Sequence, residues 1–379
     1  KPENIILDQN QFPKITGFNI SKEIDKDNKE RSHQIKGTPA YIAPEIYSKH
    51  EYSKSSDVYS YSLILYELIT NIEPYEIMSN KKPYEDEDIN TNDINELYSN
   101  HIKVGHRPTF LKPIPQAYKE LIERCWSEEP SQRPTFSEIV DTLKTNHNFI
   151  TETVDEEDFF KYVKMIDESV ITFDPTKRIN HLMDLYKSQK HIFPKSNIKM
   201  NFGDIYSTEE YTIFFDIKYI NLNDFECEKR IAYGKSFEIY KIKHIKTKKI
   251  YSAKISNRKI NHLITSFPNF DHPLVTKFIG YSFKDFKNKP KLVLVNEYVS
   301  NGSLDEILNL EKENNSVPNW TDTKKLINIY GIAFALSFLH SHDFIHQQLE
   351  PKNVLLDDYL FPKIGFDVYN EMDKYIMQP

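Results

Sequence analysis

The sequence predicts two incomplete copies of one domain, which the family resemblance described below implies to be of the α+β class, and two observations carry the prediction of two copies. A loop is written twice, as KPENIILDQNQFPKITGF in residues 1–18 and as EPKNVLLDDYLFPKIGF in residues 350–366. Different runs of motifs follow the first copy and precede the second. A repeat separated by this length indicates two copies of a domain, not a short solenoid unit.

Composition narrows the class of protein. The chain has 379 residues, a net charge of −7 and two cysteines, Cys125 and Cys227. The negative net charge gives no basic surface potential that would attract nucleic acid or an anionic membrane. No apolar run has the length of a membrane span. The two cysteines are far apart in the sequence and support neither a disulfide framework nor a zinc site. We expect a soluble, cytoplasmic protein with protein partners or protein substrates. Because Lys1 is not an initiator methionine and no signal peptide precedes it, we also expect a fragment.

Two stretches after the first loop copy favour helices. Apolar residues without Gly or Pro fill residues 58–69, which is typical of a buried helix, and residues 118–125 carry the spacing of an amphipathic one. The apolar positions are Val58, Leu63, Leu65, Leu68 and Ile69 in the first stretch, and Tyr118, Leu121, Ile122 and Cys125 in the second.

The motifs of this first segment occur in a recognisable order. They are KGTPAYIAPEIY in residues 36–47, SDVYSYSLILYELIT in 56–70 and RCWSEEPSQRPTFSEIV in 124–140. With the loop, they resemble the C-terminal lobe of a eukaryotic protein kinase of the Ser/Thr, tyrosine-kinase-like branch. The resemblance implies that residues 1–145 are a partial kinase domain, from the catalytic loop to the final helices.

The resemblance also implies roles for single residues of the first segment. Lys1 would contact the transferred phosphate and Asn4 a metal ion, as in the catalytic loop of kinases. Glu45 and Arg133 would form a buried ion pair, and Asp57 would hold the backbone of the catalytic loop. The roles of Glu45, Arg133 and Asp57 are structural.

The metal-binding motif of the first copy departs from the family. Kinases have D-F-G where this chain has Gly17-Phe18-Asn19. The carboxylate that would hold Mg²⁺ is absent, and the neutral oxygen of Asn19 is a poor substitute for it.

Residues 146–223 are expected to form a partly helical linker. Acidic residues 155–158 precede an apolar face at helical spacing, made by Phe159, Tyr162, Val163 and Ile166. A second short helix is expected from Ile179, and residues 211–220 have an extended pattern. We expect the linker to pack partly on the first lobe and otherwise to act as a spacer.

The second segment, residues 224–379, resembles an N-terminal kinase lobe, its hinge and the start of a C-terminal lobe. Its motifs are IAYGKSFEIYKI in residues 231–242, YSAKI in 251–255, KLVLVNEYVSNGSL in 291–304 and LINIYGIAFALSFLHSHDFIH in 326–346. The fold implied is bilobal and kinase-like, present as a C-terminal-lobe fragment, a linker, and an N-terminal lobe with the start of a second C-terminal lobe.

The residues that would cover the phosphates of ATP are altered. The three positions of the glycine-rich loop are Ala232, Gly234 and Phe237, and side chains at the first and third would crowd the phosphates. Lys254 matches the lysine that grips phosphates, but the position of its usual Glu partner holds Leu263.

The residues implied to meet the adenine depart less from the family pattern than those implied to meet the phosphates. The resemblance implies that Ala253 touches the adenine and that the backbone of the hinge residues Glu297 and Tyr298 meets it. ATP and Mg²⁺ are thus implied as cofactors by the family, while the substitutions speak against full use of both.

The second catalytic loop has lost most of its polar chemistry. Gln348 stands where the family has the Asp that deprotonates the substrate hydroxyl, and an amide cannot accept that proton. Glu350 replaces the phosphate-contacting Lys, and Asn353 remains as a candidate metal ligand. The D-F-G motif has become Gly365-Phe366-Asp367.

Three hypotheses follow. The first is a tandem kinase-like protein whose second domain is a catalytically impaired pseudokinase, a regulatory or interaction module that allows weak ATP binding. The alternative is an active Ser/Thr kinase that transfers the γ-phosphate through a complete first domain. The third is intramolecular complementation, in which residues 224–379 followed by residues 1–145 supply one nearly complete kinase fold.

Overall fold

The computed structural model describes residues 30–31, 35, 37–75, 98–169, 219–233, 237–256, 272–315, 317–342 and 344–364. These residues fall into two compact units, a helical unit and a sheet unit. The helical unit contains the described residues up to Ser169 together with Pro273–Thr276 and residues 299–364. The sheet unit contains the described residues of 219–272 and Lys277–Tyr298.

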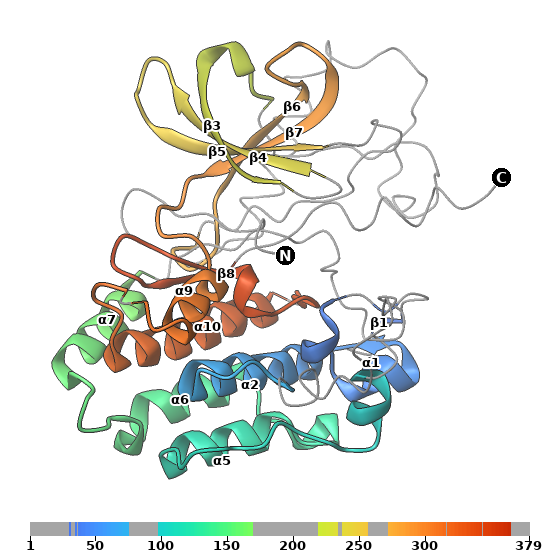
Figure 1. Ribbon diagram of the computed structural model, residues 1–379, viewed down its shortest axis with the longest axis vertical. Helices are drawn as coiled ribbons and strands as arrows, with labels where there is room; N and C mark the ends of the chain where they lie inside the picture. The colour runs from blue at the N-terminus through green and yellow to red at the C-terminus, as the bar shows by residue number, and fades with distance from the viewer. Residues whose placement is uncertain are drawn as a thin grey trace. The chain divides into compact units, whose positions relative to one another are not determined.

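The helical unit combines elements from both kinase-like segments and the linker (Figure 1). Its elements from the described residues up to Ser169 include β1 (Glu30–Arg31), α1 (Pro44–Lys49), β2 (Glu51–Tyr52), α2 (Lys54–Thr70), α5 (Gln116–Cys125), α6 (Phe136–Thr145) and α7 (Glu156–Glu168). Those from the second segment are α9 (Leu304–Lys312), α10 (Asp322–Ser341), β8 (Val354–Leu356) and β9 (Pro362–Ile364). In Figure 1, the blue to green helices of the first segment and linker therefore lie in the same unit as the orange to red helices of the second segment.

Local sequence explains where these helices begin and end. α6 starts at a capping box in which Thr135 and Glu138 exchange hydrogen bonds. α7 starts where the Asp155 side chain accepts from the backbone of Asp158, 2.9 Å away, and its acidic first turn suits the positive end of the helix dipole. α2 ends at Asn71, which takes the left-handed conformation typical of helix ends.

The predicted helices of the first segment and linker are confirmed. The predicted apolar positions of α2 are buried except Ile69, which is half-buried, and those of α5 and α7 are all buried. α7 packs against α10 of the second segment, where the Phe159 and Tyr330 ring centroids lie 5.8 Å apart. The Tyr162 ring centroid also lies 4.6 Å from that of Phe361, the residue just before β9. The linker helix expected from Ile179 lies outside the described residues.

α10 forms the centre of the helical unit. It is apolar on all sides, as expected of a helix buried around its whole circumference, and it contacts α2, α6, α7 and β9. Nine of its apolar side chains are fully buried: Leu326, Ile327, Ile329, Tyr330, Ile332, Ala333, Ala335, Leu336 and Leu339. The helices of the first segment and linker thus cover a helix of the second.

The sheet unit is a five-stranded antiparallel sheet in the order β3-β4-β5-β7-β6 (Figure 1). The strands are β3 (Phe225–Tyr233), β4 (Phe237–His244), β5 (Ile250–Ser256), β6 (Phe278–Lys284) and β7 (Pro290–Glu297). Alternation along the strands gives the sheet two apolar faces. The larger core contains Ile220, Leu222, Ile242, Ala253, Ile255, Val293 and Val295, and the smaller contains Ile239, Leu292 and Leu294.

Helices and an antiparallel sheet together make the α+β fold that the sequence predicts. In the described part of the chain, no helix is long and apolar enough to cross a membrane. The domain ranges 1–145, 146–223 and 224–379 remain a prediction.

Candidate functional site

A buried ion pair anchors α1 to the rest of the helical unit. Arg133 donates through Nη1 to Glu45 Oε1 at 2.8 Å and through Nη2 to Glu45 Oε2 at 2.9 Å. The guanidinium also donates to the carbonyl oxygens of Ser127 and Ser55. Bidentate geometry of this kind is strong and directional, so the predicted pair of Glu45 and Arg133 is confirmed.

Asp57 of α2 holds the catalytic loop that belongs to the second segment. Its Oδ2 accepts from the backbone N–H of His346 at 2.6 Å, and its Oδ1 accepts from that of Gln347 at 2.8 Å. His340 Nε2 lies 3.0 Å from the same carboxylate. The predicted role of Asp57 is confirmed, on a loop from the other segment.

The loop residues 348–353 form a closed network. Asn353 Nδ2 donates to the carbonyl oxygen of Gln348 at 2.6 Å and to Glu350 Oε1 at 3.2 Å. Glu350 Oε2 lies 2.7 Å from Lys352 Nζ. Both Glu350 and Asn353 are buried. The side chains of Glu350 and Asn353 are therefore engaged with each other, and Gln348 takes part through its backbone carbonyl.

Lys352 is the site residue that the sequence reasoning missed. Its ammonium group contacts Glu350 and also the hydroxyl of Thr38, which lies just before α1 in the first segment. The signal was present in the repeat, because the first copy has Lys-Pro-Glu-Asn in residues 1–4 and the second has Glu-Pro-Lys-Asn in residues 350–353. The order of the charges is reversed, and the structure pairs them.

His346 is buried as a neutral ring. Burial lowers the pKa of His346 to about 4, although the Asp57 carboxylate acts in the opposite direction. Its Nδ1 accepts from the backbone N–H of Gln348 at 3.3 Å, which requires this nitrogen to be unprotonated. We assign His346 to support of the loop backbone and not to proton transfer.

The described loop residues do not fit Mg²⁺. This ion is usually held by one or two carboxylates with waters and phosphates. Asn353 offers a neutral oxygen, and the carboxylate next to it, Glu350, is already paired with an ammonium group. Among the described residues there is also no group of three His, Cys, Asp or Glu that could hold a metal.

The residues predicted to meet ATP on β5 lie on opposite faces of the sheet. Lys254 is buried between Ile239 and Leu294 in the strand register, whereas Ala253 belongs to the larger core on the other face. Ser252 shares the face of Lys254 because side chains alternate along a strand. We therefore propose that Ser252, and not Ala253, contacts the adenine.

The hinge residues lie at the end of β7. Glu297 is buried, and its Oε1 accepts from the backbone N–H of Lys277 at 2.7 Å. Its carbonyl oxygen accepts from the Ser252 hydroxyl at 3.4 Å. Tyr298 is half-buried, with Lys241 Nζ 5.3 Å from its ring centroid. The side chain of Glu297 thus fixes the strand end.

Several predicted site residues lie outside the described residues. They are Lys1 and Asn4 of the first loop, Gly234 of the glycine-rich loop, Leu263, and both D-F-G-like motifs at residues 17–19 and 365–367. Their predicted roles remain predictions.

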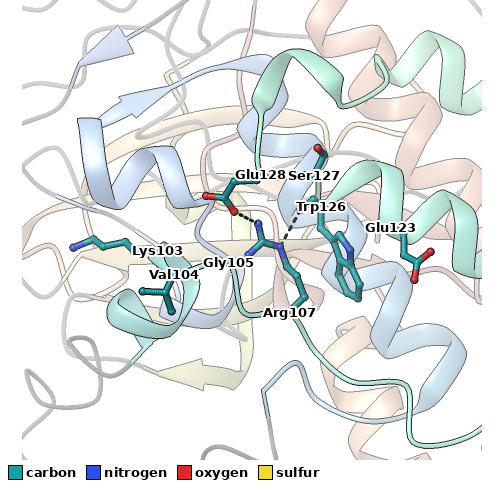
Figure 2. Close-up of a pocket in the computed structure, with 8 residues that line it drawn as sticks. All are labelled: Lys103, Val104, Gly105, Arg107, Glu123, Trp126, Ser127 and Glu128. Atoms are coloured by element: carbon teal, nitrogen blue, oxygen red, sulfur yellow. Dashed lines mark hydrogen bonds and ion pairs between the residues drawn. The ribbon is translucent and has the colours of Figure 1, made fainter.

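A surface hollow of about 540 Å³ lies away from the loop residues, between residues 103–107 and the end of α5 (Figure 2). Arg107 crosses it and donates to Glu128 Oε2 at 2.7 Å and to the Trp126 carbonyl oxygen at 2.9 Å. Val104 is 70% exposed beside it. The hollow contains none of the predicted site residues and carries charges of both signs.

Comparison with known families decides the identity of the fold. The family described as "Protein kinase domain" matches residues 1–150, and that described as "Protein tyrosine and serine/threonine kinase" matches residues 234–375. The chain belongs to the eukaryotic protein kinase superfamily, in its tyrosine-kinase-like Ser/Thr branch. Both kinase segments predicted from the sequence are thereby confirmed.

Individual relatives agree with this assignment. A 146-residue stretch is 34% identical to "Dual specificity protein kinase shkB" of Dictyostelium discoideum, covering 37% of this chain and 19% of that protein. The kinase shkC of the same organism is 32% identical over 176 residues, covering 45% and 31%. "Serine/threonine-protein kinase 12" of Arabidopsis thaliana is 35% identical over 149 residues, covering 38% and 29%. The chain therefore spans less than a third of each of these relatives.

Proposed function

We propose that this kinase-family chain acts as a catalytically impaired regulatory or interaction module. Its partners are proteins, and its place is the cytoplasm, as the two free cysteines, one of them exposed, suggest. This module binds ATP weakly and without dependence on Mg²⁺.

The observation that carries the proposal is the closed network of the second loop. Transfer of a phosphoryl group to a hydroxyl needs a group that accepts the hydroxyl proton and cations that neutralise the phosphates. Gln348 cannot accept a proton at physiological pH, and Lys352, the cation of the loop, is 2.7 Å from Glu350. The network supports a folded loop whose charges neutralise each other.

The sheet unit supports weak nucleotide binding. Lys254 is retained and buried, Ser252 lies two residues before it on β5, and the hinge residue Glu297 is at the end of the neighbouring strand β7. A buried lysine next to a nucleotide contributes charge to phosphates without a metal ion. This part of the proposal concerns ATP alone.

A second candidate is an active kinase that uses the first segment. It is supported by Lys1 and Asn4, which keep the family residues, and by the printed names of the relatives, which are dual-specificity and Ser/Thr kinases. It requires an Asp two residues before Lys1 and a substitute for the metal-binding Asp at Gly17. The sequence of the gene upstream of Lys1 is its simplest test, since a residue without a carboxylate at that place would exclude it.

Transfer of the γ-phosphate from ATP to a mixed peptide substrate tests the leading proposal. We expect the full chain to give no turnover above that of Lys254→Met, with or without Mg²⁺. The matched control is Lys249→Met, at an exposed lysine just before β5. Turnover that needs Mg²⁺ and is lost in Lys254→Met but kept in Lys249→Met would overturn the proposal.

A thermal-shift titration with ATP tests the binding part. We expect a small rise in melting temperature that is equal with and without Mg²⁺ and absent in Lys254→Met, because ligand binding to the native state stabilises it. A rise that appears only with Mg²⁺ would contradict metal-independent binding.

A further inference from the structure

We propose that the two kinase-like segments of one chain assemble a single helical lobe, in which the partner of the α2–α6 face is α10 of the same chain. The interaction surface consists of α2, α6 and the residues before α1 on one side, and of α9, α10 and the loop at residues 346–353 on the other. This inference does not depend on whether the chain transfers phosphate.

The apolar part of the interface is formed by α10. A helix that is apolar on all sides needs neighbours on all sides, and α2 and α6 supply two of them. The Phe136 ring of α6 lies 5.0 Å from the His340 ring of α10, between centroids. The Tyr61 hydroxyl of α2 donates to the Ile329 carbonyl oxygen of α10 at 3.1 Å. These contacts join residues that are more than two hundred positions apart in the sequence.

The polar contacts across the interface are specific. Asp57 is 1% exposed and receives its three hydrogen bonds from residues 340, 346 and 347 of the second segment. A buried carboxylate is costly unless it is hydrogen-bonded. The second segment therefore satisfies a charge that α2 buries.

A second buried carboxylate repeats this arrangement. Glu67 of α2 is 2% exposed, accepts from the Tyr41 hydroxyl at 2.7 Å and lies 2.8 Å from Lys312 Nζ of α9. Tyr41 belongs to the first segment and Lys312 to the second. The pair joins the two segments at the other end of α2 from Asp57.

The linker helix adds contacts of the same kind. At the start of α7 and α10, the Thr153 hydroxyl donates to Asp322 at 2.5 Å, and the backbone N–H of Asp155 donates to the Thr323 hydroxyl at 2.8 Å. Lys324 Nζ lies 3.4 Å from Asp158. The two helix starts are thus locked to each other, which places the linker on the second segment as well as the first.

Charge reversal at Glu67 and Lys312 in the full chain tests the proposal. We expect Glu67→Lys and Lys312→Glu each to lower the melting temperature by roughly 5 °C or more, and the double variant to recover at least half of the summed loss, because the charges attract again. The control is reversal of Lys119 and Glu123, an exposed pair within α5. Strictly additive effects at Glu67 and Lys312 would overturn the proposal, since residues in contact are coupled.

Two further measurements separate assembly within one chain from the alternatives. A protease site inserted between residues 169 and 219 of the full chain allows the linker to be cut, and we expect the two pieces to co-elute in gel filtration. Separation of the pieces would overturn the proposal. Co-expression of the two single variants tests exchange between chains: recovery of the wild-type melting temperature in that mixture would show assembly between two copies and overturn assembly within one.

Discussion

The turn between β8 and β9 contains a carboxyl group whose charge opposes folding. Asp357 is fully buried, and its Oδ1 accepts the backbone N–H groups of Tyr359 and Phe361, each at 2.8 Å. Its Oδ2 has no hydrogen-bond partner among the described residues. Burial raises the pKa of Asp357 to about 7, although the two N–H groups and Lys363 favour the charged form.

The sign and size of the effect follow from this pKa. An unfolded Asp has a pKa of about 3.9, and one pKa unit corresponds to 1.36 kcal/mol. The folded state prefers the protonated carboxyl, so the contribution of Asp357 to the free energy of unfolding is highest below about pH 4 and falls as the pH rises to about 7. The fall attributable to Asp357 is about 4 kcal/mol, and it is constant above that pH.

Asp357→Asn removes this dependence on pH. The amide oxygen can still accept both N–H groups, while the new NH₂ group takes the place of Oδ2 and lacks an acceptor, at a cost of about 1–3 kcal/mol. We expect the variant to be about 1–3 kcal/mol more stable than the wild type at pH 8, and the difference to reverse near pH 4. Urea unfolding of both proteins from pH 4 to pH 8 measures it.

The comparison between variant and wild type isolates Asp357 from other titrating groups, because those are common to both proteins. The matched control is Asp358→Asn, at the exposed neighbouring position. A difference in free energy of unfolding between Asp357→Asn and the wild type that does not change between pH 4 and pH 8 would refute the reasoning.

Three further predictions concern the helical unit. Arg133→Met leaves the Glu45 carboxylate buried without its ion-pair partner, so it should lower the free energy of unfolding, measured in urea, by about 3–5 kcal/mol. A loss below about 1 kcal/mol would contradict a buried pair. The His346 ring is neutral in the fold, so the wild type should lose about 3 kcal/mol of unfolding free energy as the pH falls from about 6.5 to 4 and the unfolded ring becomes protonated. His346→Gln should abolish this loss. Equal acid unfolding curves for the two proteins would argue against the prediction. Thr135→Ala removes the cap of α6 and should cost about 1 kcal/mol in thermal unfolding, with Glu138→Gln, which keeps an acceptor for the Thr135 backbone, costing less.

Local features of the fold could be predicted from the sequence because they depend on near neighbours. The apolar faces of α2, α5 and α7 follow from spacing along the chain, and the cap of α7 from the acidic run at residues 155–158. The pair of Glu45 and Arg133 and the role of Asp57 were accessible because the motifs around them keep the family order. In each case, the residue type and its position were enough.

The partner of each apolar face could not be predicted in the same way. Periodicity says that α10 is buried, but not which helices cover it. The two segments carry matching parts of one fold, so the α2–α6 face of the first segment is suited to a helix such as α10, whichever segment supplies it. The sequence likewise predicts Ala253 at the adenine, beside Lys254. Because side chains alternate along β5, adjacent residues face opposite sides of the sheet, and Ala253 belongs to the larger core.

The second loop shows why catalytic residues could change while the loop kept its shape. Asp57 holds the loop through the backbone N–H groups of His346 and Gln347, and it keeps Gln347 in the left-handed conformation at φ 64°, which is unfavourable for a residue with a Cβ. These bonds place no demand on the side chains at positions 347 and 348. Substitution of Asp by Gln at position 348 therefore removes the proton acceptor without removing a contact that supports the loop.

At positions 350 and 352, in contrast to 347 and 348, the fold does place a demand on the side chains. Glu350 is buried, and its charge is balanced by the side chain of Lys352. A change of sign at one position alone would leave two like charges about 3 Å apart, which is strongly unfavourable in a buried site. The two positions are expected to change together, and the first loop copy, with Lys1 and Glu3 in the reverse order, differs from the second at both. Under the proposed function, selection for the folded loop accounts for this pattern, because a requirement to bind phosphate would favour lysine at position 350.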